Sequence, residues 1–184
     1  RAHFAIRPYP AQLVETADVL GRTVTLRPIR PEDEAQHLAF LALLSPEDVR
    51  MRVFYSRRSI EHSELARLTQ IDYEREMAFI ATVPTVDGGE ETLGVVRAVT
   101  DPDNQDAEFA IIVRSDLKGS GLGRRLMAKL IAYCRERGTR RMVGTVLARN
   151  TRMLALAGQL GFVAQPGSED EDTVSVALPL QPPA

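Results

Sequence analysis

Three glycines placed between an apolar segment and an amphipathic segment constrain this chain more than any other feature. Gly119, Gly121 and Gly123 follow residues 109–113, a β-branched and aromatic run that predicts a strand. The segment after them repeats apolar side chains every four residues, which predicts a helix, at Leu122, Leu126, Leu130 and Cys134. A glycine loop that leads into a helix N-terminus presents unpaired N–H groups at the positive end of the helix dipole. We therefore expect an anion site suited to phosphate.

Two common phosphate-binding patterns do not fit this loop. The P-loop requires Gly-Lys-Ser/Thr, whereas Gly123 is followed by two arginines. The dinucleotide pattern G-x-G-x-x-G would begin at Gly119 and Gly121, but Gly123 comes one position too early for its last glycine. That pattern also needs an acid after the next strand, where this chain has Asn150. The spacing that remains is Lys118-x-x-Gly121-x-Gly123.

Composition excludes several classes of protein. A chain of 184 residues with 44% hydrophobic content can bury one core, so we expect one domain. A net charge of −2 argues against a nucleic-acid partner, and no apolar run approaches the ~20 residues of a membrane span. One cysteine excludes an internal disulfide and predicts a cytoplasmic protein. His3, His37 and His62 share no ligand spacing, so we expect no metal.

The remaining segments predict a mixed α/β order. Residues 1–22 read as a connector, within which residues 11–20 fit a helix or a strand equally well. Expected strands lie at 23–26, 77–83, 92–99, 109–113 and 142–147, with a last hairpin from 162 to 178. Expected helices start at Pro31, Ser45, Ser59, Leu122 and Thr151.

The loop Lys118-x-x-Gly121-x-Gly123 resembles the pyrophosphate loop of the GNAT superfamily of N-acyltransferases, in which Gln or Arg is usual at the position of Lys118. The order of elements over residues 23–180 also resembles the GNAT fold. That resemblance implies a mostly antiparallel central sheet flanked by helices, with the fourth and fifth strands splayed apart. Further segments resemble the acetyltransferase part of bacterial Pat-type protein lysine acetyltransferases, at residues 6–10, 26–33, 68–73 and 149–153.

This resemblance implies a domain organisation and a reaction. We expect a GNAT domain at 23–180, with 1–22 as the junction to a fused domain similar to ADP-forming acyl-CoA synthetases. The chain lacks an initiator Met, which fits a fragment cut at such a junction. The implied co-substrate is acetyl-CoA. The implied acceptor is an exposed lysine of a protein such as an AMP-forming acyl-CoA synthetase.

The resemblance also assigns residues to roles. Glu108 matches the general base. The implied contacts to coenzyme A are Ile111, Ile112 and Val113 for the pantetheine arm, Lys118, Gly119, Ser120, Gly121, Leu122, Gly123 and Arg124 for the pyrophosphate, and Asn150, which is also a helix N-cap. Candidates for contact with the acceptor lysine are Asp72, Tyr73 and Glu76, and the acidic turn at 169–172 could meet a basic substrate surface.

Two positions leave questions open. Ala157 stands where many GNAT enzymes carry a tyrosine that protonates the leaving thiolate, so the general acid has no assignment. Cys134 shares its helical face with Leu126 and Leu130, which predicts a packed thiol and not an acyl carrier. Three alternatives to lysine acetylation remain at this point: acetylation of a small-molecule amine, a domain that only senses acyl-CoA, and a Rossmann-like NADP module.

Overall fold

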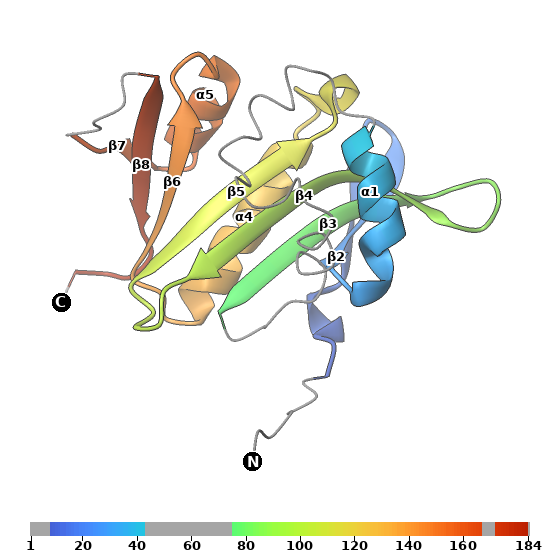
Figure 1. Ribbon diagram of the computed structural model, residues 1–184, viewed down its shortest axis with the longest axis horizontal. Helices are drawn as coiled ribbons and strands as arrows, with labels where there is room; N and C mark the ends of the chain where they lie inside the picture. The colour runs from blue at the N-terminus through green and yellow to red at the C-terminus, as the bar shows by residue number, and fades with distance from the viewer. Residues whose placement is uncertain (1–7, 43–74, 167–171, 184) are drawn as a thin grey trace.

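The computed structural model describes residues 8–42, 75–166 and 172–183. The helices expected from Ser45 and Ser59, the candidates Asp72 and Tyr73, and residues 169–171 of the acidic turn lie outside this described part. The described part builds a sheet of eight strands in the order β1-β2-β3-β4-β5-β6-β8-β7, with helices on both faces (Figure 1).

From β2 onward, the described elements follow the predicted order. The strands are β1 (Glu15–Val19), β2 (Arg22–Pro28), β3 (Glu76–Pro84), β4 (Glu90–Thr100), β5 (Asp106–Val113), β6 (Arg141–Leu147), β7 (Val163–Ala164) and β8 (Thr173–Pro179). The helices are α1 (Glu34–Ala42), α4 (Leu122–Glu136) and α5 (Thr151–Gln159), with 3-10 turns η1 (Ala11–Leu13), η2 (Pro31–Asp33) and η4 (Ser115–Leu117). No helix in the described ranges is long and apolar enough to cross a membrane.

The sheet begins earlier in the chain than the expected boundary at residue 23. Residues 15–19, which lie inside the expected connector, form β1 and pair antiparallel with β2 from Glu15↔Leu26 to Val19↔Arg22. The tight turn at Leu20 and Gly21, both at positive φ, brings the two strands together. Because the apolar and polar residues of 11–20 alternate only weakly, pairing with β2 decides the strand, and that pairing is not visible in the local pattern.

The first helix also starts differently from the prediction. Pro31 opens a 3-10 turn, and the α-helix begins only at Glu34. Asp33 explains the tight turn, because its carboxylate accepts the Arg30 N–H at 2.6 Å and binds both terminal nitrogens of buried Arg27 at 2.9 and 2.7 Å. This carboxylate therefore ties the turn back to β2.

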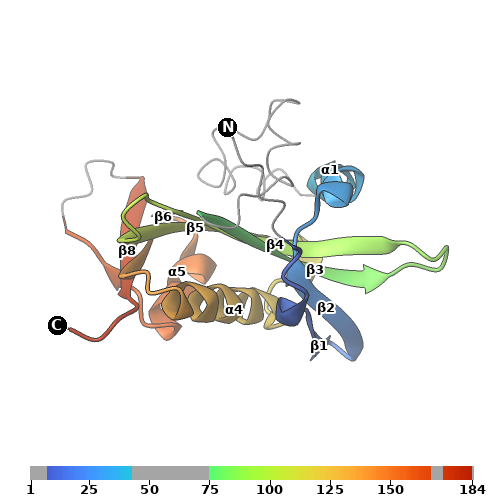
Figure 2. The same cartoon turned by 90° about the horizontal axis from the view of Figure 1, so that it is seen from below.

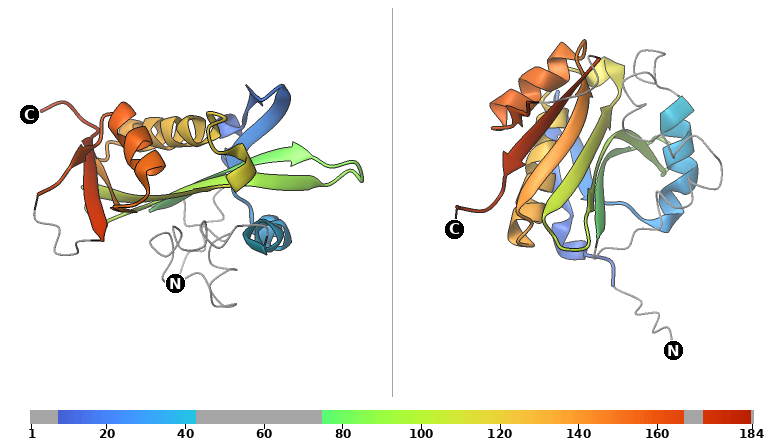
Figure 3. Two further views of the ribbon diagram at one scale, coloured as in Figure 1. Left: turned by 90° about the horizontal axis from the view of Figure 1, so that it is seen from above. Right: turned by 60° about the vertical axis from the view of Figure 1, so that its left-hand side comes forward.

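The helices cover opposite faces of the sheet. Figures 2 and 3 show α4 and α5 on one face and α1 on the other. The larger core lies under α4, whose buried side includes Leu122, Leu126, Leu130 and Cys134, as the four-residue period predicts. A smaller cluster lies on the α1 face and includes Ile112 of β5. Successive residues of β5 thus serve two cores, since side chains alternate across a strand.

The strands β5 and β6 are parallel and stay together for only a short distance. Their register covers Asp106↔Arg141, Ala107↔Met142 and Glu108↔Val143, and then the ladder stops. From there the strands diverge, and α5 packs beside the open end (Figure 1). This is the splay expected between the fourth and fifth predicted strands, so the predicted fold class is confirmed. Because no described strand pairs with the remainder of β5 on this side, its outward-facing backbone groups could pair with a ligand.

Candidate active site

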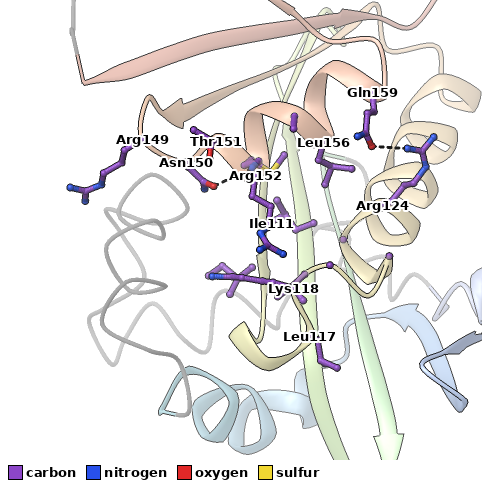
Figure 4. A pocket seen from close by; sticks show the side chains of 17 residues that line it. Ile111, Leu117, Lys118, Arg124, Arg149, Asn150, Thr151, Arg152, Leu156 and Gln159 are labelled. Atoms are coloured by element: carbon purple, nitrogen blue, oxygen red, sulfur yellow. Dashed lines mark hydrogen bonds between the residues drawn. The ribbon is translucent and has the colours of Figure 1, made fainter.

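A cleft of about 620 Å³ occupies the gap that the splayed strands leave. Its walls are the end of β5, the loop between β5 and α4, and α5 with the loop before it (Figure 4). The lining residues are Ile111, Ile112, Val113, Leu117, Lys118, Gly119, Gly121, Gly123, Arg124, Arg149, Asn150, Thr151, Arg152, Met153, Ala155, Leu156 and Gln159. The glycine loop and the splayed strand, which are predicted separately from sequence, therefore meet in one cavity.

The glycine loop is held at both of its ends. Before it, Arg114 pairs with Asp116 at 2.8 Å and with Glu91 of β4, which fixes the turn that follows β5. Within it, the hydroxyl of Ser120 accepts the Leu122 N–H at 3.3 Å and so fixes the end of the loop at the start of α4. A loop anchored in this way presents its remaining amides in a fixed arrangement, which a bound anion requires.

Two of the three glycines adopt a backbone conformation that other residues avoid. Gly119 has φ of +85° and Gly121 has φ of +88°. A Cβ on Gly121 would meet no atom within 4 Å, so this position opens onto empty space beside the helix N-terminus. Gly123 differs, because a Cβ there would contact Leu156 of α5 at 3.5 Å and Ile111 at 3.8 Å. The glycines therefore keep a passage open between the loop, β5 and α5.

The charges on the cleft have one sign. Lys118, Arg124, Arg149 and Arg152 line it, and no acidic side chain of the described residues does. Arg152 extends from α5 toward the loop, where its Nη1 lies 3.3 Å from the place a Cβ of Gly119 would take (Figure 4). Arg124 instead donates to Gln159 Oε1 at 3.0 Å, and Arg149 points outward in Figure 4. Near Gly119, the loop therefore combines the amides at the start of α4 with the guanidinium of Arg152, and this combination suits a pyrophosphate.

Side chains at the end of β5 point alternately to the two faces of the sheet. Ile111 and Val113 pack toward the α4 face, whereas the Ile112 side chain is buried in the cluster on the α1 face. Any contact from Ile112 to a ligand in the cleft must therefore come from its backbone. An amide-bearing chain such as pantetheine could pair with this strand, because the neighbouring β6 has moved away beyond Glu108.

Asn150 caps the helix on the opposite wall. Its Oδ1 accepts the Met153 N–H at 3.1 Å, which is the N-cap predicted from sequence. The same residue lines the cleft, so capping and contact with a ligand are compatible.

Glu108 lies at the last pair of the β5–β6 ladder, where the splay begins. It is exposed, and its register partner in β4 is Val99, which in turn pairs with Glu76 of β3. Paired residues of neighbouring antiparallel strands share a face, so two carboxylates flank the 42% exposed side chain of Val99. Glu76 also pairs with buried Arg97 at 3.8 Å. Of the three substrate-side candidates, Glu76 is the one within the described residues.

The sequence predicts some of the residues that line this cleft and does not predict others. Ser120 and Leu122 were expected at the pyrophosphate, but neither lines the cavity, and the Leu122 side chain is fully buried in the core. The wall contributed by α5 was largely missed. Its signal is the spacing of Arg152, Leu156 and Gln159, which at i, i+4 and i+7 lie on one helical face.

The two positions that the sequence leaves open, Ala157 and Cys134, both lie in the core. The methyl group of Ala157 has no proton to donate, and the side chain is 1% exposed and does not line the cleft. Cys134 is buried, and burial raises the pKa of its thiol to about 12. A thiol that stays protonated at neutral pH is a poor nucleophile, which argues against a covalent acyl carrier. No group of three or more metal-binding side chains occurs in the described part of the chain.

Known proteins share this sequence and architecture. Acetyltransferase PA5475 of Pseudomonas aeruginosa is 34% identical over 160 residues, covering 87% of this chain and 86% of that protein. The GNAT domain of PAT from S. lividans matches with a TM-score of 0.80 at 25% identity, covering 94% of this chain and 99% of that one. The fold is also that of yncA from Salmonella typhimurium, solved with its cofactor acetyl-CoA, with a TM-score of 0.64, 20% identity, and 88% and 96% of the two chains covered.

The family assignment follows from the sequence match together with the geometry. A family model described as the acetyltransferase (GNAT) family matches residues 44–162, which include the splayed strands, the glycine loop and α5. Over this range the structure has the cleft, the cationic lining and the loop geometry that a phosphate-bearing acyl donor requires. This chain is a member of the acetyltransferase (GNAT) family.

Proposed function

We propose that the protein transfers an acetyl group from acetyl-CoA to the ε-amine of a lysine on a protein substrate, with Glu108 as the general base. The observation that carries this proposal is the position of Glu108. It is an exposed carboxylate at the last pair of the β5–β6 ladder, three residues along β5 from Ile111, where the lining of the cationic cleft begins. A cofactor that enters along the cleft would bring its thioester to this point.

The chemistry requires a base at this position. A lysine amine has a pKa of about 10.4, so only roughly one in 2,500 is neutral at pH 7, a deficit of about 4.6 kcal/mol. Glu108 would accept the ammonium proton, directly or through a water. The neutral nitrogen would then attack the thioester carbonyl carbon, and the carbon–sulfur bond would break to release the thiolate. When the amide forms, the nitrogen loses its second proton, and a water could carry that proton to the thiolate, whose thiol has a pKa of about 8.5.

The acceptor side supports an amine on an alkyl chain. Glu76 and Glu108 flank Val99 in one row of the sheet face, about 10 Å apart as alternate strands of a sheet are. Carboxylates attract an ammonium group, and an exposed valine can contact the methylene stem of a lysine. A flexible diamine would meet the same row, so the choice of a protein substrate rests on the resemblance to Pat-type enzymes and is tested separately below.

The central test is Glu108→Gln, which keeps the shape of the side chain and removes the base. We expect kcat to fall by about 10²–10⁴-fold while the dissociation constant of acetyl-CoA stays within twofold. Glu136→Gln, an exposed glutamate at the end of α4, is the matched control and should leave both values unchanged. Unchanged turnover in Glu108→Gln would remove this residue from the mechanism. Wild type that binds acetyl-CoA and acetylates nothing would support a sensing role instead.

The nature of the acceptor needs its own experiment. Acyl-CoA synthetases, unrelated folded proteins and a panel of polyamines and aminoglycosides should be incubated with the protein and acetyl-CoA, and the products identified by mass spectrometry. We expect stoichiometric acetylation at one lysine of a folded protein that Glu108→Gln abolishes. Faster turnover of a small amine than of any protein lysine would favour the small-molecule alternative.

A further inference from the structure

The aromatic ring of Phe109 lies at the narrow end of the splay. Phe109 follows Glu108 and Gly144 follows Val143, so these two residues are the first positions beyond the last pair of the β5–β6 ladder. A Cβ built on Gly144 would lie 2.3 Å from Cε1 and 2.6 Å from Cζ of the Phe109 ring. Such distances are impossible for a real side chain, so the ring occupies the space that any residue other than glycine would need.

The ring is held in place from a second side. Phe109 is 7% exposed, and its centroid lies 5.1 Å from that of Phe162, which follows α5. The ring therefore connects β5, β6 and the chain after α5 at the point where the two strands separate. The cavity lining ends at Ile111 on this strand, and Phe109 is the next side chain on the same strand face toward the narrow end of the splay.

The dimensions bring the acyl group to this boundary. The strand from Val113, beside the glycine loop, to Glu108 spans five residues, or about 17 Å at 3.3 Å per residue. An extended pantetheine arm has a comparable length, so phosphates held at the loop leave the thioester beside Glu108. Glu108 lies on the acceptor face at this level, and the next residue, Phe109, lies on the cleft face. An acyl chain that continued from the thioester along the cleft face would meet the ring.

We propose that Phe109, seated on Gly144, sets the acyl specificity of the enzyme by limiting the donor to an acetyl group. The inference rests on the proposed function for its catalytic readout. One added methylene in a confined pocket changes discrimination by about 10–200-fold. We therefore expect wild type to use butyryl-CoA at least about 10-fold less well than acetyl-CoA, by kcat/KM.

The test compares Phe109→Leu and Phe109→Ala with wild type on acetyl-, propionyl- and butyryl-CoA. Phe109→Leu keeps most of the core packing, and the ratio of kcat/KM for two donors does not depend on the fraction of folded protein. Phe79→Leu is the matched control, because Phe79 is fully buried in the same core but lies on β3, away from the splay. We expect the butyryl/acetyl ratio to rise at least about 10-fold in the Phe109 variants and to stay within twofold in Phe79→Leu.

Equilibrium binding separates this inference from the proposed function. If no acceptor is acetylated, the affinities of CoA, acetyl-CoA and butyryl-CoA still measure how the Phe109 ring limits the length of the acyl chain. Wild type should bind butyryl-CoA more weakly than acetyl-CoA, and the Phe109 variants should bind both alike. Equal use or binding of the two donors by wild type would overturn the inference. A ratio in the Phe109 variants that matches wild type, or an equal rise in Phe79→Leu, would overturn it as well.

Discussion

Gly121 shows how one residue prepares the loop for an anion. It is the N-cap of α4, and its φ of +88° turns the chain so that the first amides of the helix face the cleft. An L-residue in this left-handed region is strained by roughly 1–2 kcal/mol, which glycine avoids. The glycine is therefore required twice, once by the backbone conformation and once by the space a ligand would occupy.

Gly121→Ala tests this double role against a matched glycine. Gly88 in the β3–β4 turn has the same φ of +88° and the same empty surroundings, but it lies far from the cleft in sequence and in the fold. We expect both alanine variants to lose a similar free energy of unfolding, about 1–2 kcal/mol, in urea titrations. Only Gly121→Ala should also weaken the binding of acetyl-CoA, by about 10–150-fold. The reason is that a hydrogen bond from a backbone amide to a charged phosphate contributes about 1.5–3 kcal/mol. Equal loss of affinity in both variants would assign the effect to global stability.

The short parallel ladder between β5 and β6 is the element on which the cleft depends. Its first pair is Asp106↔Arg141, and the two side chains also form an ion pair of 2.8 Å. The ladder ends two residues later at Glu108. A side-chain pair at the closed end helps hold strands together that must separate at the other end. Hydrogen bonds from Arg141 lower the pKa of Asp106 below its ordinary value.

Asp106→Asn should therefore reduce stability in a pH-dependent way. A depressed pKa in the folded state means that the contribution is fully present above the unfolded pKa of about 3.9 and is lost as the pH falls below it. Both side chains are more than one third exposed, so screening limits the loss to below about 1 kcal/mol at pH 7. Urea titrations at pH 7 and pH 3 should show the difference between variant and wild type shrink at the lower pH. A difference that is the same at both values would contradict the ion pair as its cause.

At the scale of the whole molecule, the cleft lies between two parts of the sheet. One part is β1–β5 with α1 and α4, and the other is β6–β8 with α5 (Figure 1). The loop at 118–124 belongs to the first part and Arg152 to the second, and both line the cavity. A ligand bound by both parts would oppose their separation and stabilise the folded state.

Thermal unfolding with acetyl-CoA measures this coupling. At a ligand concentration of 100 times the dissociation constant, binding adds about 2.7 kcal/mol, which for a chain of this size raises the Tm by about 5–11 °C. A thioester of N-acetylcysteamine carries the acyl end without the phosphates and should give no shift at the same concentration. An equal rise in Tm with NADPH would show that the cleft binds dinucleotides in general and is not selective for coenzyme A.

The parts of the site that follow from local sequence were predictable. The strand at 109–113, the three glycines and the helix that starts at Leu122 are neighbours in the chain, and their spacing indicates an anion loop before any tertiary contact is known. The N-cap at Asn150 is equally local, because the side chain binds an amide three residues on. The buried side of α4 follows from a four-residue period.

Other features depend on segments that are far apart in the chain. β1 forms because β2 folds back on it, the α5 wall meets the loop only across the splay, and the Phe109 ring needs Gly144 of another strand. The sequence alone thus determined the glycine loop and, from β2 onward, the order of the described elements, since hydrogen bonds and periodicity act over a few residues. Tertiary structure decided where β5 and β6 separate and what closes the gap, because packing between distant residues sets those positions.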